Sequence, residues 1–409
     1  MAVFGIFGRK KDQKRSIYHS APSVFSMPPA DFGVEVNTKT ALNVTAFYAG
    51  VRIIAENIAS LPKTVRVQTK TGMSERVKHP AFRLINIRPN GYTNVFDFWS
   101  VLLTWLEGWG NAYAVIERNA DGTPVALHQV HPDCVTVAMS KGKKWYKVSG
   151  VDNDLSFLNG IYPDENMLHF MLLSQDGIIG MNPVLANAMA LGKSVAIEKF
   201  AGEYYKRRGE IKAVLETDGH MSDEEYNTFR AHYDAASDNY KTPLLEYGIK
   251  YKQVAIDPTA AKLLESETYS VLDVCRILNI PPHMLAELTH ATFSNIEHQT
   301  IQFVQYTLRP VIKKLEMELE YKLFTEREQA KYDVKFILDG LLRGDTQARS
   351  AFYHNAILDG YMSRNEVREL EGLEHVDGLD VMLYPLNTGM VGAGPQTTSN
   401  EEKNDTDPA

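Results

Sequence analysis

The chain has 409 residues, of which 44% are hydrophobic and 23% are charged, a composition typical of a soluble globular protein that can form two or three domains. Its net charge of −8 excludes a protein that grips nucleic acid over a large basic surface, because such binding depends on Lys and Arg at the phosphates. Two cysteines without a paired motif exclude a disulfide framework and a cysteine-rich zinc site.

The first 39 residues lack hydrophobic periodicity and contain Pro22, Pro28 and Pro29, which predicts a flexible N-terminal arm. The apolar start, Met1 to Gly8, is too short for a secretory leader and precedes its basic cluster instead of following it. No stretch approaches the roughly 18 apolar residues that a membrane span requires. We therefore expect no membrane partner.

A first block of helices and strands is predicted between residues 40 and 182. Helical spacing runs from Val44 to Leu61 and stops at Pro62, and Thr64 to Lys70 alternates like a strand. Thr93 is interpreted as the cap of a helix whose inward residues are Phe96, Trp99, Leu102, Leu103 and Leu106. The β-rich part that follows has strands at 111–118, 125–130, 135–139, 145–148 and 167–173.

Two long helices then enclose a small insert. Asn182-Pro183 opens a helix predicted to reach Arg208, and a second helix spans Ala260 to Ile280. The insert, residues 210–257, combines a strand at 211–215, a helix capped by Ser222 and Glu225, and a hairpin around Gly248. This pattern indicates a two-helix stalk with a small tip.

The longest helical pattern follows residues 280–285 (IPPHML) and a short neutral loop. Ser294 and Glu297 form a capping box, and one apolar stripe comprises Ile301, Val304, Leu308, Val311, Ile312, Leu315, Leu319 and Leu323. Pro310 lies inside the stripe and predicts a kink near Tyr306 to Pro310. A strand at 334–338, helices at 345–358 and 363–370, and a disordered tail from residue 387 complete the chain.

Residue patterns that could support catalysis or metal binding are weak. His128 and His131 would point to opposite faces of a strand, which favours ordinary polar residues over a metal pair. Gly108-Trp109-Gly110 is interpreted as a helix end and not as half of a dinucleotide loop. No phosphate-binding Gly-x-x-x-x-Gly-Lys loop is present. We predict no catalytic residue, no cofactor, no metal site and no enzymatic activity.

An ordered set of short motifs resembles the tailed-bacteriophage portal protein family over about Val44 to Pro385. The motifs are residues 51–59 (VRIIAENIA), His79-Pro80, 88–90 (RPN), 110–114 (GNAYA), His131-Pro132, 176–180 (DGIIG), Asn182-Pro183, 280–285 (IPPHML), 293–297 (FSNIE), 343–345 (RGD) and Asn365-Glu366. The family usually has Ser-Pro where Asn182-Pro183 stands, and often a Gly after the residue matching Leu285.

The resemblance implies an α+β, portal-like multidomain subunit. Its parts would be an arm (1–39), a wing (40–182), a stem helix (183–209), a clip (210–257), a second stem helix (258–280), a tunnel loop with the long kinked helix and a returning wing strand (281–339), a crown (340–386) and a tail (387–409).

The family's function would be that of a dodecameric ring at one capsid vertex, made in the host cytoplasm and carried in the virion. Double-stranded DNA would pass through it during packaging and ejection. Its partners would be the terminase large subunit, the major capsid protein and a head-completion or adaptor protein. Two alternatives stay open at this point: a metal-dependent nuclease and a non-portal oligomeric scaffold.

The resemblance also suggests two binding surfaces. The clip would dock partners through Glu224, Glu225 and Arg230. The tunnel loop would face DNA and comprises Glu287, Leu288, Thr289, His290, Ala291, Thr292, Phe293, Ser294 and Asn295. One residue of this loop is charged and none is basic, so it would touch a duplex without holding it. The alternative for the same segment is a buried turn between helices.

Overall fold

The computed structural model describes residues 17–19, 35–68, 74–76, 79–206, 213–216, 219, 221–238, 249–253, 260–288, 293–338, 346–371 and 373–383. The chain divides into two compact units, residues 1–338 and residues 339–409, and each is described by itself. The boundary lies one residue before the start of the predicted crown. The predicted tail and most of the predicted arm fall outside the described residues.

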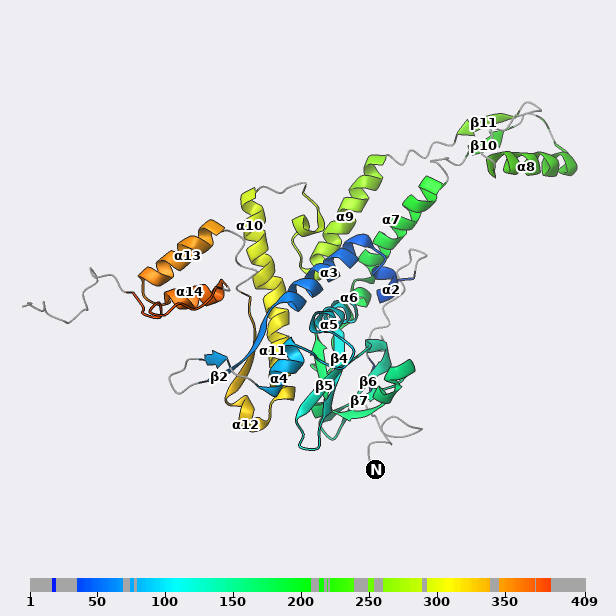
Figure 1. Ribbon diagram of the computed structural model, residues 1–409. Coiled ribbons are helices and arrows are strands. Elements are labelled where there is room, and N and C mark those ends of the chain that lie inside the picture. The colour runs from blue at the N-terminus through cyan, green and yellow to red at the C-terminus, as the bar shows by residue number, and fades with distance from the viewer. Residues whose placement is uncertain are drawn as a thin grey trace, which may run out of the picture. The chain divides into compact units, whose positions relative to one another are not determined.

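Unit 1 is organised around two helices that pack together, α3 (Thr45–Ser60) and α5 (Val95–Trp109) (Figure 1). Both have buried apolar residues three and four positions apart, the spacing that places them on one face. Helix α3 ends before Pro62, as predicted. Helix α5 ends at Gly110, whose φ of +75° is the left-handed conformation of a helix cap, so the prediction of a helix end there is confirmed.

The start of α5 differs from the prediction in two respects. Asn94, and not Thr93, is the cap, because its side chain accepts the backbone N–H of Asp97 at 2.8 Å. Phe96 is exposed, whereas Trp99 and the three predicted leucines are buried. Helical spacing gives the direction of a side chain but does not show how far the elements that cover it extend.

Strand β4 (Asn111–Arg118) is the centre of a three-stranded antiparallel sheet between β5 (Pro124–Val130) and β9 (Met167–Met171). Its first six residues are all buried, so both faces of the strand are covered. A second antiparallel sheet has the order β1-β6-β7-β8. Its strands are β1 (Ile17–His19), β6 (Val135–Ser140), β7 (Lys143–Val148) and β8 (Gly160–Pro163). Strand β1 belongs to the predicted arm and was not expected.

The third sheet joins distant parts of the sequence. Strand β2 (Lys63–Gln68) lies between β3 (Ser74–Arg76) and β12 (Tyr332–Phe336), both antiparallel to it. Arg66 and Asp333 hold this pairing with two hydrogen bonds, of 2.9 and 2.5 Å, between guanidinium and carboxylate. The shorter elements of unit 1 are α2 (Thr38–Ala41), α4 (Pro80–Asn86), α12 (Glu326–Gln329), η1 (Pro132–Cys134), η2 (Asn153–Leu158) and η3 (Asp164–Asn166).

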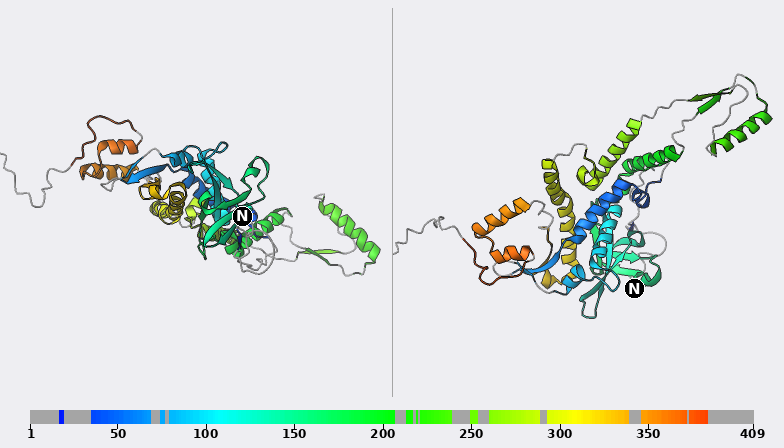
Figure 2. Two further views of the ribbon diagram at one scale, coloured as in Figure 1. Left: turned by 90° about the horizontal axis from the view of Figure 1, so that it is seen from below. Right: turned by 45° about the horizontal axis from the view of Figure 1, so that its top comes forward.

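The helix predicted from Pro183 to Arg208 is interrupted. Asn182 caps it as expected, accepting the N–H groups of Val184 and Leu185, but α6 (Pro183–Ala186) ends at Asn187. The Asn187 side chain donates to the carbonyl of Pro183 at 2.8 Å and ends the first turn. Helix α7 (Ala188–Lys206) then runs beside α9 (Ala260–Leu278) in both views of Figure 2. Their contact includes a hydrogen bond of 2.6 Å between Ser270 and Ser194.

Between α7 and α9 the chain forms β10 (Ala213–Glu216), α8 (Asp223–Asp238) and β11 (Lys250–Gln253). The predicted capping box of α8 is confirmed: Ser222 and Glu225 each accept a hydrogen bond from the other's backbone N–H. Strand β11 pairs with β10. The first arm of the hairpin predicted around Gly248 lies outside the described residues.

The longest helical run consists of α10 (Phe293–Gln302), a π-helical segment (Phe303–Leu308) and α11 (Arg309–Leu323). A kink was predicted near Tyr306 to Pro310; the structure has a π-helical segment directly before Arg309-Pro310. Within the predicted stripe Val304, Leu308, Ile312 and the three later leucines are buried, whereas Ile301 is exposed. Among the described residues no helix has the length and apolarity needed to cross a membrane.

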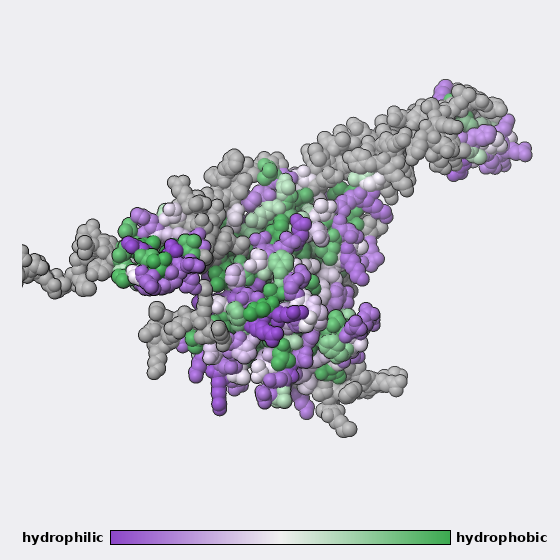
Figure 3. Space-filling view, in the orientation of Figure 1, coloured by the Kyte–Doolittle hydropathy of each residue, from purple (hydrophilic) through white to green (hydrophobic). Residues whose placement is uncertain are grey.

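Unit 2 contains α13 (Thr346–Leu358) and α14 (Arg364–Leu370). The capping box predicted at Ser363 and Glu366 is confirmed. Asn365 is buried and its amide donates to the carbonyl of Val376 and to the carboxylate of Asp380, which holds the segment after α14. Several large apolar side chains of this unit, Phe352 and Tyr361 among them, are exposed (Figure 3).

Candidate functional site

The predicted tunnel loop belongs to a hairpin formed by the end of α9, a connection and α10. Helix α9 ends at Asn279, whose φ of +53° is left-handed and whose successor, Ile280, donates its N–H to the carbonyl of Cys275 at 2.9 Å. This is the usual way to end a helix, with Asn in place of Gly. The single-turn helix η4 (Pro282–Leu285) follows and stops at Ala286, which is also left-handed.

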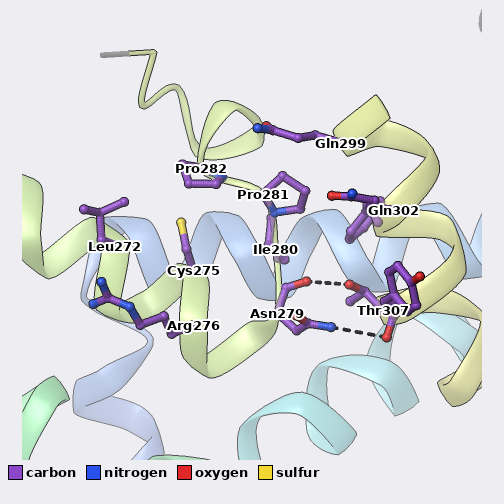
Figure 4. A pocket seen from close by; sticks show the side chains of 12 residues that line it. Leu272, Cys275, Arg276, Asn279, Ile280, Pro281, Pro282, Gln299, Gln302 and Thr307 are labelled. Atoms are coloured by element: carbon purple, nitrogen blue, oxygen red, sulfur yellow. Dashed lines mark hydrogen bonds between the residues drawn. The ribbon is translucent and has the colours of Figure 1, made fainter. Parts of the chain in front are cut away.

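The base of the hairpin is held by Asn279. Its side-chain amide donates to the carbonyl of Tyr306 at 3.2 Å, and its own carbonyl accepts the hydroxyl of Thr307 (Figure 4). In an α-helix the carbonyl of Tyr306 would accept the N–H of residue 310, which is a proline and has none. The Asn279 amide therefore donates to a carbonyl that residue 310 cannot serve.

A second hydrogen bond crosses the hairpin nearer to its tip. Nδ1 of His283 in η4 lies 2.8 Å from Oε1 of Gln299 in α10. Beyond it the connection continues through Glu287, whose N–H donates to the carbonyl of Pro282 at 3.1 Å, and through Leu288. The two sets of hydrogen bonds fix both sides of the hairpin up to the predicted loop.

A pocket of about 450 Å³ lies between α9 and the π-helical segment, at the base of this hairpin. Figure 4 shows its lining: the apolar side chains include Leu272 and Ile280, and the polar ones include the amides of Gln299 and Gln302. Its one lining cation, Arg276, lies 2.6 Å from the carboxylate of Asp273. Burial raises the pKa of the Cys275 thiol to about 11, the largest effect on that group, and the charge of Glu287 raises it further.

The predicted tunnel-loop residues are only partly described. Glu287 and Leu288 are the last described residues of the connection, and Leu288 is 59% exposed. Thr289, His290, Ala291 and Thr292 lie outside the described residues. Phe293, Ser294 and Asn295 belong to α10, which begins one residue before the predicted start, so these three are helical and not loop residues. The capping contact expected between Ser294 and Glu297 lies outside the described side chains.

Lys and Arg are absent from a long part of this hairpin. The sequence from Ile277 to Leu308 contains no Lys or Arg. The described hydrogen bonds that hold it use amide, hydroxyl, imidazole and backbone groups. An arrangement of this kind can contact a polyanion without the attraction that basic residues would add.

The predicted clip residues all lie on α8. Glu224, Glu225 and Arg230 are exposed, and the α8 surface visible in Figure 3 is largely hydrophilic. Glu225 is engaged in the capping box, where the backbone and hydroxyl groups of Ser222 lower its pKa.

The histidines considered for metal binding have other roles. His128 is buried, with its Nε2 2.9 Å from the Glu117 carboxylate and its Nδ1 3.2 Å from the Tyr92 hydroxyl. His131 caps η1 by accepting the N–H of Asp133. Within the described parts of the chain no three His, Cys, Asp or Glu side chains are grouped as a metal would require.

Comparison with known proteins identifies the family. The family model for the phage portal protein matches residues 45–372. The chain belongs to the phage portal protein family. Portal proteins form a structural family and are not enzymes.

Two curated portal proteins are similar over most of their length. The probable portal protein of Streptomyces phage phiC31 is 28% identical over 396 residues, covering 92% of this chain and 85% of the relative. The portal protein of Enterobacteria phage HK97 is 24% identical over 362 residues, covering 85% and 83%.

Solved structures share the portal fold. A chain in the virion of a native gene transfer agent particle has a TM-score of 0.57 at 19% identity, with 84% of this chain and 95% of that chain covered. A crystal structure of an HK97-family portal protein from Corynebacterium diphtheriae has a TM-score of 0.55 at 15% identity, with 75% and 96% covered.

The sequence pattern did not reveal the residues that hold this hairpin: Asn279, Gln299 and Thr307. Two signals were present. An Asn directly before Ile280-Pro281 is a typical left-handed helix end. A proline at position 310 also leaves the carbonyl of residue 306 in need of a donor. The identity of the donor depends on which helix lies alongside, and that is a tertiary property.

Proposed function

We propose that this chain assembles into a dodecameric ring at one capsid vertex, through which DNA is packaged and later ejected. The observation that carries the proposal is the match of the portal family model to residues 45–372. A similar solved chain comes from the neck of a gene transfer agent particle computed with C12 symmetry, at 18% identity and a TM-score of 0.54. Force for packaging would come from the terminase, since this chain offers no nucleotide-binding motif.

Within this ring the loop from Glu287 to Asn295 would narrow the tunnel and face the duplex. Its connection is held on both sides by Asn279 and by the His283–Gln299 contact, and no basic residue lies between Ile277 and Leu308. Such a loop would touch DNA without holding it, because affinity for the backbone comes from Lys and Arg. The three residues of α10 would form its helical edge.

The clip would dock the terminase large subunit and later a head-completion or adaptor protein, with the major capsid protein around the ring. Reversing charge at Glu224 and Arg230 should weaken terminase binding in a pull-down while the ring stays intact. Loss of the ring itself would show that α8 contacts neighbouring subunits.

Electron micrographs and native mass of the purified protein test the ring. The expected result is a closed particle of about twelve subunits. A protein that stays monomeric at high concentration and low salt would contradict the proposal. Incubation with linear DNA and Mg²⁺ tests the nuclease alternative. Cleavage that disappears with a single Asp or Glu substitution would support that alternative.

A further inference from the structure

Helix α9 contacts different neighbours on its two sides. Ser270 faces α7 through its hydrogen bond to Ser194, whereas Leu272 and Arg276 line the pocket beside the π-helical segment. At about 100° per residue, Ser270 points roughly opposite to these two residues. Helix α7 therefore lies on one side of α9 and the pocket on the other. Figure 1 shows α7 and α10 on opposite sides of α9.

The pocket beside α9 has the properties of a protein contact. Its lining includes Tyr306, whose large apolar side chain is 61% exposed. Its lining combines apolar groups with neutral amides, and Arg276 is already paired with Asp273. A phosphate would find no free positive charge in this lining, whereas an apolar side chain would find a matching surface.

The outer face of α7 supplies such side chains. Met189 is 59% exposed, and Ala196 and Phe200 follow it at intervals of seven and eleven residues, which keeps them on one stripe. Ser194, which contacts α9, and the buried Leu191 lie on the opposite face of the helix. Methionine is flexible and fits irregular cavities well.

We propose that the outer face of α7 in one copy of the chain packs against the pocket of the next copy, with Met189 entering the pocket. This rests on the proposed ring. A cyclic ring joins two different faces of every subunit, so a knob on one side must meet a recess on the other. The two faces lie on opposite sides of the α7–α9 pair, and a head-to-tail arrangement brings them together.

Blocking each side separately tests the proposal. Gln302→Trp fills the pocket from an exposed position, and Met189→Asp removes the apolar knob. Each should raise the protein concentration at half-assembly by about tenfold or more, the effect of losing one central contact at every interface. Gln305→Trp is the matched control, since Gln305 is exposed in the same segment and does not line the pocket; it should assemble like the wild type.

Mixing the two blocked variants sharpens the result. Gln302→Trp keeps a working α7 face and Met189→Asp keeps a working pocket, so one interface can form between them and the mixture should give 1:1 dimers. Assembly of either single variant at the wild-type concentration would overturn the inference, as would a mixture that stays monomeric although circular dichroism shows both chains folded. Rings formed equally by all variants would leave the proposed function standing, whereas a monomeric wild type would refute the proposed function itself.

Discussion

The two halves of the long helical run are held in opposite ways. On α11, Glu318 accepts the N–H of His169 in β9 at 3.0 Å, and Lys314 donates to the carbonyl of Leu172 directly after β9 at 2.6 Å. Lys322 donates to the carbonyl of Asp164 in η3 at 2.7 Å. Glu316 and Glu320 bind β12 on the other side. On α10, the described contact to the facing connection is the neutral pair His283 and Gln299.

This difference shows how one continuous helix can serve two purposes. Helix α11 lies between two sheets. Its charged side chains form hydrogen bonds with backbone N–H and carbonyl groups that apolar side chains could not satisfy. These charged residues lie on the helix face opposite the apolar stripe, where exposure to water is expected, yet Glu316 is only 5% exposed. The α10 half contains no Lys or Arg, and the described contact of its Gln299 is neutral.

The largest expected effect comes from Glu316. Its carboxylate binds the Lys335 ammonium at 2.8 Å and the Phe336 N–H at 3.0 Å. Glu316→Ala should lower the free energy of unfolding by about 3–5 kcal/mol, because it leaves a half-buried charge and a strand N–H unpaired. Urea unfolding measures this, and Gln299→Ala in the hairpin should cost about 1 kcal/mol or less. Equal losses of unfolding free energy in the two variants would show that α10 and α11 are held equally strongly.

The next largest effect is a pH dependence of the free energy of unfolding, and it comes from Glu107 on α5. Burial raises the pKa of Glu107 to about 7 from 4.5, and the nearby charge of Lys314 on α11 lowers it less strongly. Since the folded pKa is the higher one, the stability contributed by this group is complete below pH 4.5 and is lost as the pH rises through about 7. The full loss is roughly 3 kcal/mol.

Glu107→Gln should abolish this part of the pH dependence, measured as the free energy of unfolding between pH 5 and 8. Glu224→Gln on the exposed face of α8 is the control and should leave it unchanged. An unaltered slope in Glu107→Gln would contradict the assignment.

A smaller effect tests how the hairpin tolerates its proline. Asn279→Gly keeps the left-handed backbone without strain but removes the amide that binds the Tyr306 carbonyl, so it should cost about 1 kcal/mol. In a Pro310→Ala background the same change should cost less, because residue 310 then has an N–H to donate. A double-mutant cycle measures the coupling. Strictly additive effects would show that Asn279 does not compensate for Pro310.

The smallest effect on stability is expected in the loop. Thr289→Lys with Thr292→Lys should change the free energy of unfolding by no more than about 0.5 kcal/mol if the loop is exposed. DNA packaging should nevertheless slow or stall, most strongly at low salt, since each basic residue adds a phosphate contact. A large loss of folding stability would identify a buried turn, and normal packaging by an intact mutant ring would reject the tunnel assignment.

Most elements could be predicted because local rules decide them. Spacing of three and four residues located α3, α5 and α9, and capping boxes located α8 and α14. The interruption at Asn187 and the exposure of Phe96 were missed. The first depends on a side chain competing with the helix backbone, and the second on how far neighbouring elements extend.

The sequence alone determined most of the helices, several of their caps and the family resemblance, because each depends on residues close together in the chain or on ordered motifs. Only the tertiary structure decided which strands pair and which groups form hydrogen bonds across the fold. The β2–β12 pairing, the carboxylates of α11 and the Asn279 contact with Tyr306 join residues far apart in sequence. Periodicity separates an apolar face from a polar one, but whether a polar face meets water, a strand edge or an unpaired carbonyl depends on what folds against it.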